Sequence, residues 1–147
     1  MADVKFTGSC ECGHCTYACN TFPNDSGECH CITCQKLSGS SSMSFIPVPT
    51  SSLTWTNEPT VMKNTTIAER SGCIHCHSWM AMRYHSTLDR ISLNISTIDA
   101  DVLSHADLQK FMPTHHIFVA QKAVWSPIND DLPHYDRFRG DSHRIEK

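Results

Sequence analysis

The sequence predicts a mainly β domain that is organised around clusters of cysteine. Short stretches of β-forming residues alternate with turns, which is typical of an all-β core. The chain has 147 residues, of which 39% are hydrophobic, and this is enough for one core but not for two. Seven of the nine cysteines fall into three groups with short internal spacing. We therefore treat residues 1–147 as one domain and expect metal ions to take part in its structure.

The first expected strand, residues 4–8, leads into the first cysteine group, Cys10 and Cys12. Gly8 and Gly13 lie close on either side of this pair. Glycine permits the tight turn that directs both thiolates at one metal ion. We therefore interpret this segment as a zinc knuckle.

Residues 14–19 are expected to form a second strand, in which Cys15, Tyr17 and Cys19 share one face. Free cysteine behaves as a small hydrophobic residue, so we interpret Cys15 and Cys19 as buried thiols. The alternative is that these two cysteines exchange with the ligands of a metal site.

The second cysteine group is a triplet, Cys29, Cys31 and Cys34, which follows a connection rich in turn residues. Its spacing bends the backbone around a metal ion. The residues after Cys34 are expected to form a brief helical turn that is closed by Gly39.

The later part of the chain holds the third group, Cys73 and Cys76, among further expected strands. Residues 45–49 are expected at a sheet edge, because prolines interrupt them. Residues 99–111 are the one expected helix of any length, with apolar residues near helical spacing. The remaining expected strands are residues 53–55, 61–63, 65–70, 78–84, 90–96 and 116–120.

Two zinc sites are the simplest partition of these seven thiols. The two pairs, Cys10 with Cys12 and Cys73 with Cys76, supply the four ligands of a closed structural site. The triplet would hold a second zinc ion with three protein ligands, which leaves one position open for chemistry. Such a site can bind a substrate thiol as a thiolate, or hold water and polarise a carbonyl.

The charge balance argues against nucleic acid as a partner, and the lack of a long apolar stretch argues against a membrane. Twelve Lys and Arg stand against 15 Asp and Glu, so no basic excess is available to neutralise a phosphate backbone. The first residues do not have the pattern of a secretory signal, and no stretch is long enough to span a bilayer. We expect a cytoplasmic protein, with the nucleus as the alternative location. In a reducing compartment, an odd number of cysteines is better explained by metal binding than by disulfides.

The order of these motifs resembles that of one known family over about residues 6–138. The residues that carry the resemblance are Gly8-x-Cys10-x-Cys12-Gly13, Cys29-His30-Cys31-x-x-Cys34, Arg70-x-x-Cys73-x-x-Cys76, His116-Ile117-Phe118-Val119, Trp125 and Asp131-Leu132-Pro133. This order is similar to that of the glutathione-dependent formaldehyde-activating enzymes, a family that includes centromere protein V. The resemblance implies a compact zinc-binding fold of two β-sheets, similar to methionine sulfoxide reductase B, with the ligands divided as above.

The resemblance also implies an activity. In that family glutathione, as co-substrate, supplies a thiol and formaldehyde supplies a carbonyl, and the product is S-hydroxymethylglutathione. This is formally a carbon–sulfur lyase acting in reverse, so the expected partner is a small thiol and aldehyde adduct. His30 and His116 are the leading candidates for proton transfer, because histidine titrates near neutral pH. Gln35 and Trp125 are expected at the substrate site.

The sequence departs from the family pattern at three positions. Gln35 stands where many relatives carry arginine, His77 where many carry glycine, and Val124 where proline often precedes the tryptophan. A neutral amide holds a carboxylate more weakly than a guanidinium does. Two alternatives to the glutathione reaction therefore stay open. One is carbon–sulfur chemistry on another small molecule, and the other is a non-catalytic zinc module that binds a protein.

Overall fold

The computed structural model describes residues 3–139 and shows the expected alternation of short strands and turns. The strands are β1 (Phe6–Ser9), β2 (Thr16–Cys19), β3 (Gly27–Cys29), β4 (Met43–Pro49), β5 (Leu53–Thr56), β6 (Thr60–Asn64), β7 (Ala68–Gly72), β8 (Trp79–Tyr84), β9 (Arg90–Asn94) and β10 (His115–Ile117). The α-helices in these residues are α1 (Ile32–Ser38) and α2 (His105–Leu108). No helix in this part of the chain is long and apolar enough to cross a membrane.

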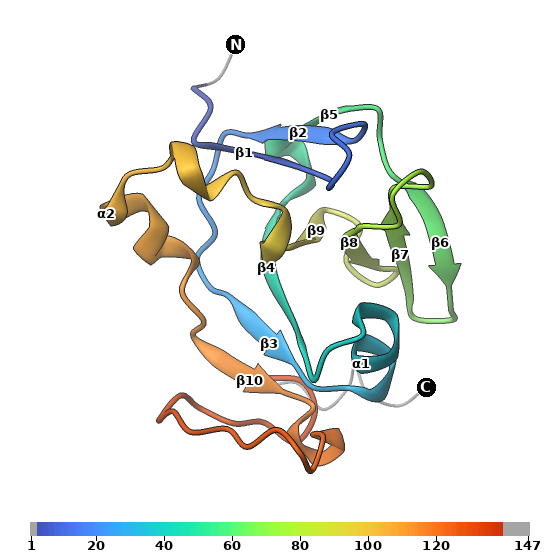
Figure 1. Ribbon diagram of the computed structural model, residues 1–147, viewed down its shortest axis with the longest axis vertical. Helices are drawn as coiled ribbons and strands as arrows, with labels where there is room; N and C mark the ends of the chain where they lie inside the picture. Colours follow the sequence, from blue (N-terminus) through green and yellow to red (C-terminus); the bar gives the residue numbers. More distant parts are fainter. Residues whose placement is uncertain (1–2, 140–147) are drawn as a thin grey trace.

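The strands form two sheets, which confirms the predicted fold class. One sheet has the order β1-β2-β5, and the other has the order β10-β3-β4-β9-β8-β7-β6. Figure 1 shows the smaller sheet at the top of the molecule, with α1 and β10 toward the opposite end. β10 runs parallel to β3, with His116 opposite Glu28 and Ile117 opposite Cys29. This pairing brings the C-terminal part of the chain beside the cysteine triplet.

The main core takes residues from both sheets. Ile46, Val48, Met80 and Leu93 of the larger sheet are fully buried, and they form one cluster with Tyr17 of the smaller sheet. As expected, Cys15 and Cys19 are buried in the same core as free thiols. Removal of this apolar surface from water is the main term that stabilises the fold.

The prediction of an edge strand over residues 45–49 is wrong, because β4 lies between β3 and β9. The first residue of β3, Gly27, lies opposite Phe45, however, and beyond that point β4 pairs only with β9. Pro47 and Pro49 therefore lie where the strand has one neighbour, and such a position tolerates a residue without a backbone N–H.

The prediction of one helix over residues 99–111 is also wrong. This segment breaks into a 3₁₀ turn at Ala100–Val102, the short helix α2 and a second 3₁₀ turn at Gln109–Phe111. Ser104 has extended backbone angles, and its side chain accepts a hydrogen bond from the backbone N–H of Asp107. A residue in this conformation starts a new helix and cannot continue an earlier one.

Candidate functional site

The two cysteine pairs come together at one end of the larger sheet. Cys10 and Cys12 follow β1, and Cys73 and Cys76 follow β7. The four Sγ atoms all lie within 4.8 Å of one another. Cys12 Sγ is 3.7 Å from Cys10 Sγ and 3.8 Å from Cys73 Sγ. Four thiols at these separations suit the tetrahedral coordination of zinc.

Backbone turns hold the pairs in place. Gly13 has a positive φ of 77° and donates its N–H to the carbonyl of Cys10 at 3.0 Å. His77 has a φ of 63° and donates to the carbonyl of Cys73 at 2.8 Å. A left-handed backbone favours glycine, so His77 has a conformation that is uncommon for a residue with a side chain.

The triplet lies where β3 passes into α1. Cys29 ends β3, Cys31 is the residue before the helix, and Cys34 lies in its first turn. Cys31 Sγ accepts a hydrogen bond from the backbone N–H of Cys34 at 3.3 Å. The predicted helical turn is confirmed, and Gly39 closes it in the left-handed conformation. A strand end and a helix start thus fix the relative positions of the three thiols.

The three thiols of the triplet are buried, and their Sγ atoms lie within 4.8 Å of one another. Hydrogen bonds with Cys29 and then Cys34 lower the pKa of Cys31 to about 2, whereas hydrogen bonds with Cys31 and then Cys34 raise the pKa of Cys29. A close group of buried sulfur atoms, one of them easily ionised, is a donor set that suits a zinc ion.

Arg70 is a functional candidate that the sequence argument did not single out. It lies on β7, and its Nη1 donates a hydrogen bond to Cys34 Sγ at 3.2 Å. Its positive charge also contributes to lowering the pKa of Cys31. The signal was present in the motif Arg70-x-x-Cys73, where an arginine precedes one of the paired cysteines. Only the order of strands in the sheet brings that arginine to the triplet.

A cavity of about 250 Å³ opens beside the triplet, with Cys29 and Cys31 in its wall. The other residues of the wall divide into an apolar part, a polar part and the cation of Arg70. The apolar part is Ile67, Ala68, Tyr84, Phe118 and Phe138, and the polar part is Thr33, Thr65, Thr66 and Gln121. The thiols of Cys29 and Cys31 therefore face a space that can hold a small ligand.

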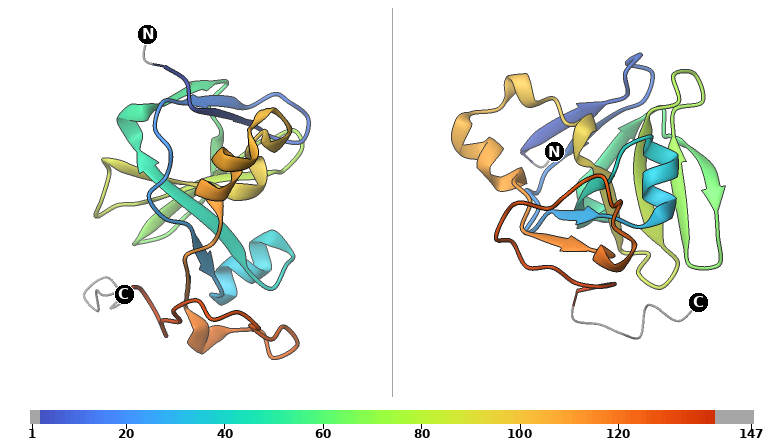
Figure 2. Two further views of the ribbon diagram at one scale, coloured as in Figure 1. Left: turned by 90° about the vertical axis from the view of Figure 1, so that its left-hand side faces the viewer. Right: turned by 60° about the horizontal axis from the view of Figure 1, so that its bottom comes forward.

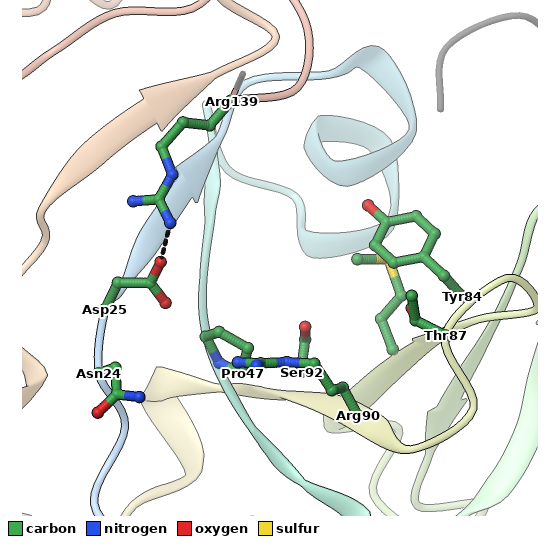
Figure 3. A pocket seen from close by; sticks show the side chains of 9 residues that line it. Asn24, Asp25, Pro47, Tyr84, Thr87, Arg90, Ser92 and Arg139 are labelled. Carbon is green, nitrogen blue, oxygen red and sulfur yellow. Dashed lines mark hydrogen bonds and ion pairs between the residues drawn. The ribbon is translucent and has the colours of Figure 1, made fainter. Parts of the chain in front are cut away.

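A second hollow of about 440 Å³ adjoins this cavity through the shared wall residue Tyr84. Figure 3 shows Arg90 and Arg139 on opposite sides of this hollow, with Arg139 paired to Asp25. Within residues 3–139, the guanidinium of Arg90 has no ion-pair partner. Tyr84 thus lies in the wall of both spaces, one of which is lined by thiols and the other by Arg90.

The structure brings the two predicted histidines together. His30 Nε2 lies 2.9 Å from His116 Nδ1, and both side chains are buried. Burial lowers the pKa of His30, so its ring is neutral near pH 7. Neither ring belongs to the wall of the cavity beside the triplet. Their part in proton transfer stays a prediction.

The predicted substrate residues lie in different surroundings. Gln35 Nε2 donates to the carbonyls of His30 at 2.7 Å and Gln121 at 2.9 Å, so both amide hydrogens are used within the chain. Trp125 is 77% exposed and lies outside the wall of the cavity. Contacts of Gln35 and Trp125 with a substrate stay predictions.

The fold and site define a class: small, mainly β proteins with clustered cysteine thiols suited to zinc. The family model of the glutathione-dependent formaldehyde-activating enzymes matches residues 5–121. The chain belongs to this family, and the resemblance read from its cysteine motifs is confirmed. Activation of an aldehyde with glutathione is the activity for which the family is named.

Comparison with solved structures gives a likeness to the crystal structure of a Rhodobacter sphaeroides protein, with a TM-score of 0.54 and 17% sequence identity. The match covers 71% of the present chain and 96% of the other. At this identity the likeness shows a shared fold. The comparison with curated proteins returned no match.

Proposed function

We propose that the protein is a zinc-dependent enzyme that joins the thiol of glutathione to formaldehyde, or to another small aldehyde, and catalyses the reverse cleavage. The observation that carries this proposal is the cysteine triplet beside a cavity, with Cys29 and Cys31 in the cavity wall. Cys29, Cys31 and Cys34 would supply three ligands to zinc and leave a position that opens toward a ligand.

The reaction is an addition and needs no oxidant. The S–H bond of the thiol breaks, the sulfur forms a bond to the carbonyl carbon, and the carbonyl π electrons move to oxygen, which takes a proton. A zinc ion held by the triplet would lower the pKa of a thiol or polarise a carbonyl. The protein would supply position, exclusion of water and charge.

Arg70 would balance the charge of the triplet. Three thiolates and one divalent cation carry a net charge of −1, which weakens the ion as an electron acceptor. The guanidinium of Arg70 donates to Cys34 Sγ and brings the local charge back to zero. This contact would offset the negative charge that otherwise weakens the zinc ion in a site made of three thiolates.

The hollow around Arg90 favours glutathione over an uncharged thiol. Glutathione is a tripeptide with two carboxylates, and Arg90 offers a cation without an ion-pair partner in the described part of the chain. Gln35 cannot donate its amide hydrogens to a substrate carboxylate, since two backbone carbonyls already accept them. We therefore expect a carboxylate of the substrate at Arg90.

The cluster of Cys10, Cys12, Cys73 and Cys76 would hold a second, structural zinc ion. Its four thiols complete a tetrahedral shell and leave no position for a substrate. It would tie the loop after β1 to the loop after β7, which belong to different sheets.

The test is the rate at which ¹³C-formaldehyde exchanges with S-hydroxymethylglutathione, measured by NMR against the uncatalysed exchange. Cys31→Ser should abolish the enzymatic part of this rate and keep the fold. Cys19→Ser is the matched control, because Cys19 is a buried thiol of the main core, in a different cluster from the triplet, and bonds to Ser52. Exchange in Cys31→Ser at the wild-type rate would refute the proposal.

A further inference from the structure

A group of metal-binding side chains lies outside both cysteine clusters. His116 of β10 meets Asp130 and His134, which belong to the segment that folds back along β10 (Figure 2, right). One ligand atom from each of the three residues lies within 4.8 Å of the other two. His116 is buried, whereas Asp130 and His134 are exposed, so the group is open to solvent on one side.

Backbone hydrogen bonds fix this arrangement. The N–H of His116 donates to the carbonyl of Pro133 at 2.9 Å, and the N–H of Tyr135 donates to the carbonyl of His116 at 2.9 Å. These bonds form a bridge that places His134 directly beside His116. The two imidazole rings meet edge to face with centroids 5.2 Å apart. The position of His134 therefore follows from the backbone.

The carboxylate of Asp130 is held at the same nitrogen. Its two oxygens lie 3.1 and 3.0 Å from His116 Nε2, and one of them accepts the backbone N–H of Leu132 at 3.0 Å. The hydrogen bond from Leu132, and then that from His116, lowers the pKa of Asp130, so the group is a carboxylate at neutral pH. Carboxylate and imidazole are common ligands of divalent zinc.

The other nitrogen of His116 has the surroundings typical of a metal-bound histidine. Nδ1 lies 2.9 Å from His30 Nε2 and 3.4 Å from a carboxylate oxygen of Glu28. A histidine that binds a metal through one nitrogen usually donates the other N–H to such an acceptor, which fixes the tautomer. In the metal-free protein Nε2–H donates to Asp130, so a bound cation would displace this proton, and with the proton on Nδ1 the lone pair of Nε2 would face the ion.

From this geometry we propose that His116, Asp130 and His134 form a divalent-cation site of the two-histidine, one-carboxylate type, suited to Zn²⁺. Ligand atoms of a tetrahedral zinc site lie about 3.3 Å apart with bonds of about 2 Å, so small movements of the exposed side chains close the site. Three protein ligands leave at least one position for water or an exogenous ligand. The site stands apart from the reaction proposed for the triplet.

The test is a titration with Co²⁺ of protein that holds two equivalents of zinc, enough for the two thiol clusters alone, measured by calorimetry and by absorption. Co²⁺ on thiolates gives an intense charge-transfer band, whereas Co²⁺ on imidazole and carboxylate gives only weak d–d bands. We expect one equivalent of Co²⁺ to bind with the weak d–d bands of imidazole and carboxylate coordination. His134→Ala and Asp130→Asn should each weaken it by at least about 100-fold, since loss of a supporting group alone costs about 10- to 100-fold.

Asp131→Asn and His105→Ala are the matched controls, because both residues are exposed and lie outside the group. They should bind the same equivalent with unchanged affinity. Asp130 and His134 are also exposed, so their variants are expected to fold, and near-ultraviolet circular dichroism checks this. The proposal is overturned if no such equivalent binds, or if the ligand variants bind it as tightly as the controls. Either result would leave the proposed reaction at the triplet untouched.

Discussion

Arg70 Nη1 donates a hydrogen bond to Cys34 Sγ across 3.2 Å, which joins β7 to the first turn of α1. Arg70 and Cys34 are 36 residues apart in the chain. The same arginine lies in the wall of the cavity beside the triplet. A single cation therefore contacts both the thiols and the space in which a ligand would bind.

Arg70→Met should lower kcat/KM for formation of the hemithioacetal by about 10- to 100-fold. The variant keeps much of the side-chain length but removes a hydrogen bond to a charged group, which is worth about 1.5–3 kcal/mol. Steady-state kinetics and zinc analysis of the same sample measure the effect. Arg83→Met is the control, since Arg83 pairs with Glu69 in the same sheet and does not contact the triplet. Equal kinetics for both variants would contradict the assigned part of Arg70.

Arg90→Ala should raise KM for glutathione about two- to fivefold and leave kcat unchanged. Arg90 is exposed, and an exposed ion pair contributes only a few tenths of a kcal/mol to about 1 kcal/mol. The ratio of KM values should fall toward one in high salt, because salt screens an exposed pair. A lowered kcat with unchanged KM would place the carboxylate of the substrate elsewhere.

The sequence predicts the cysteine clusters well because residues that are close in the chain must also be close in space. Cys29, Cys31 and Cys34 lie within one strand end and one helix turn, so local backbone decides their separation. The partner of this cluster, Arg70, depends on the position of β7 in a seven-stranded sheet. No local pattern records strand order, so this residue could be identified only from the fold.

Predictions from local sequence patterns were wrong where contacts between distant segments determine the structure. The prolines of residues 45–49 predict an edge strand, yet β4 lies between β3 and β9, and its prolines are tolerated because the pairing with β3 does not extend past Phe45. The apolar spacing of residues 99–111 predicts a helix, yet the extended conformation of Ser104 divides it. The meeting of His116 with Asp130 and His134 likewise depends on a single backbone bridge.

Cys73→Ser should destabilise the whole domain, in contrast to Cys31→Ser. Binding of a structural zinc ion contributes its free energy directly to folding, so loss of one of four ligands should cost several kcal/mol. Thermal unfolding with and without a chelator measures this. The chelator should lower the Tm of the wild type strongly and that of Cys73→Ser much less. Full thermal stability in Cys73→Ser would refute the structural part given to this cluster.

Tyr17→Phe should change how stability depends on pH above pH 10. Tyr17 is buried, and its hydroxyl is 2.9 Å from that of Thr97. Burial raises the pKa of its phenol above the ordinary value of 10.0. The unfolded chain therefore ionises first, so the contribution of Tyr17 to stability is complete below pH 10. It is lost as pH rises, by up to about 1.4 kcal/mol per pH unit.

The variant cannot lose this contribution, because phenylalanine does not ionise. At pH 8 the wild type should be more stable by about 1 kcal/mol, the net value of the hydrogen bond to Thr97. This difference should shrink above pH 10 and then change sign. Urea unfolding at pH 8 and pH 11, followed by circular dichroism, gives the two free energies. All other titrating groups are common to both proteins, so a constant difference between pH 8 and 11 would show that the phenol ionises equally in the folded and unfolded states.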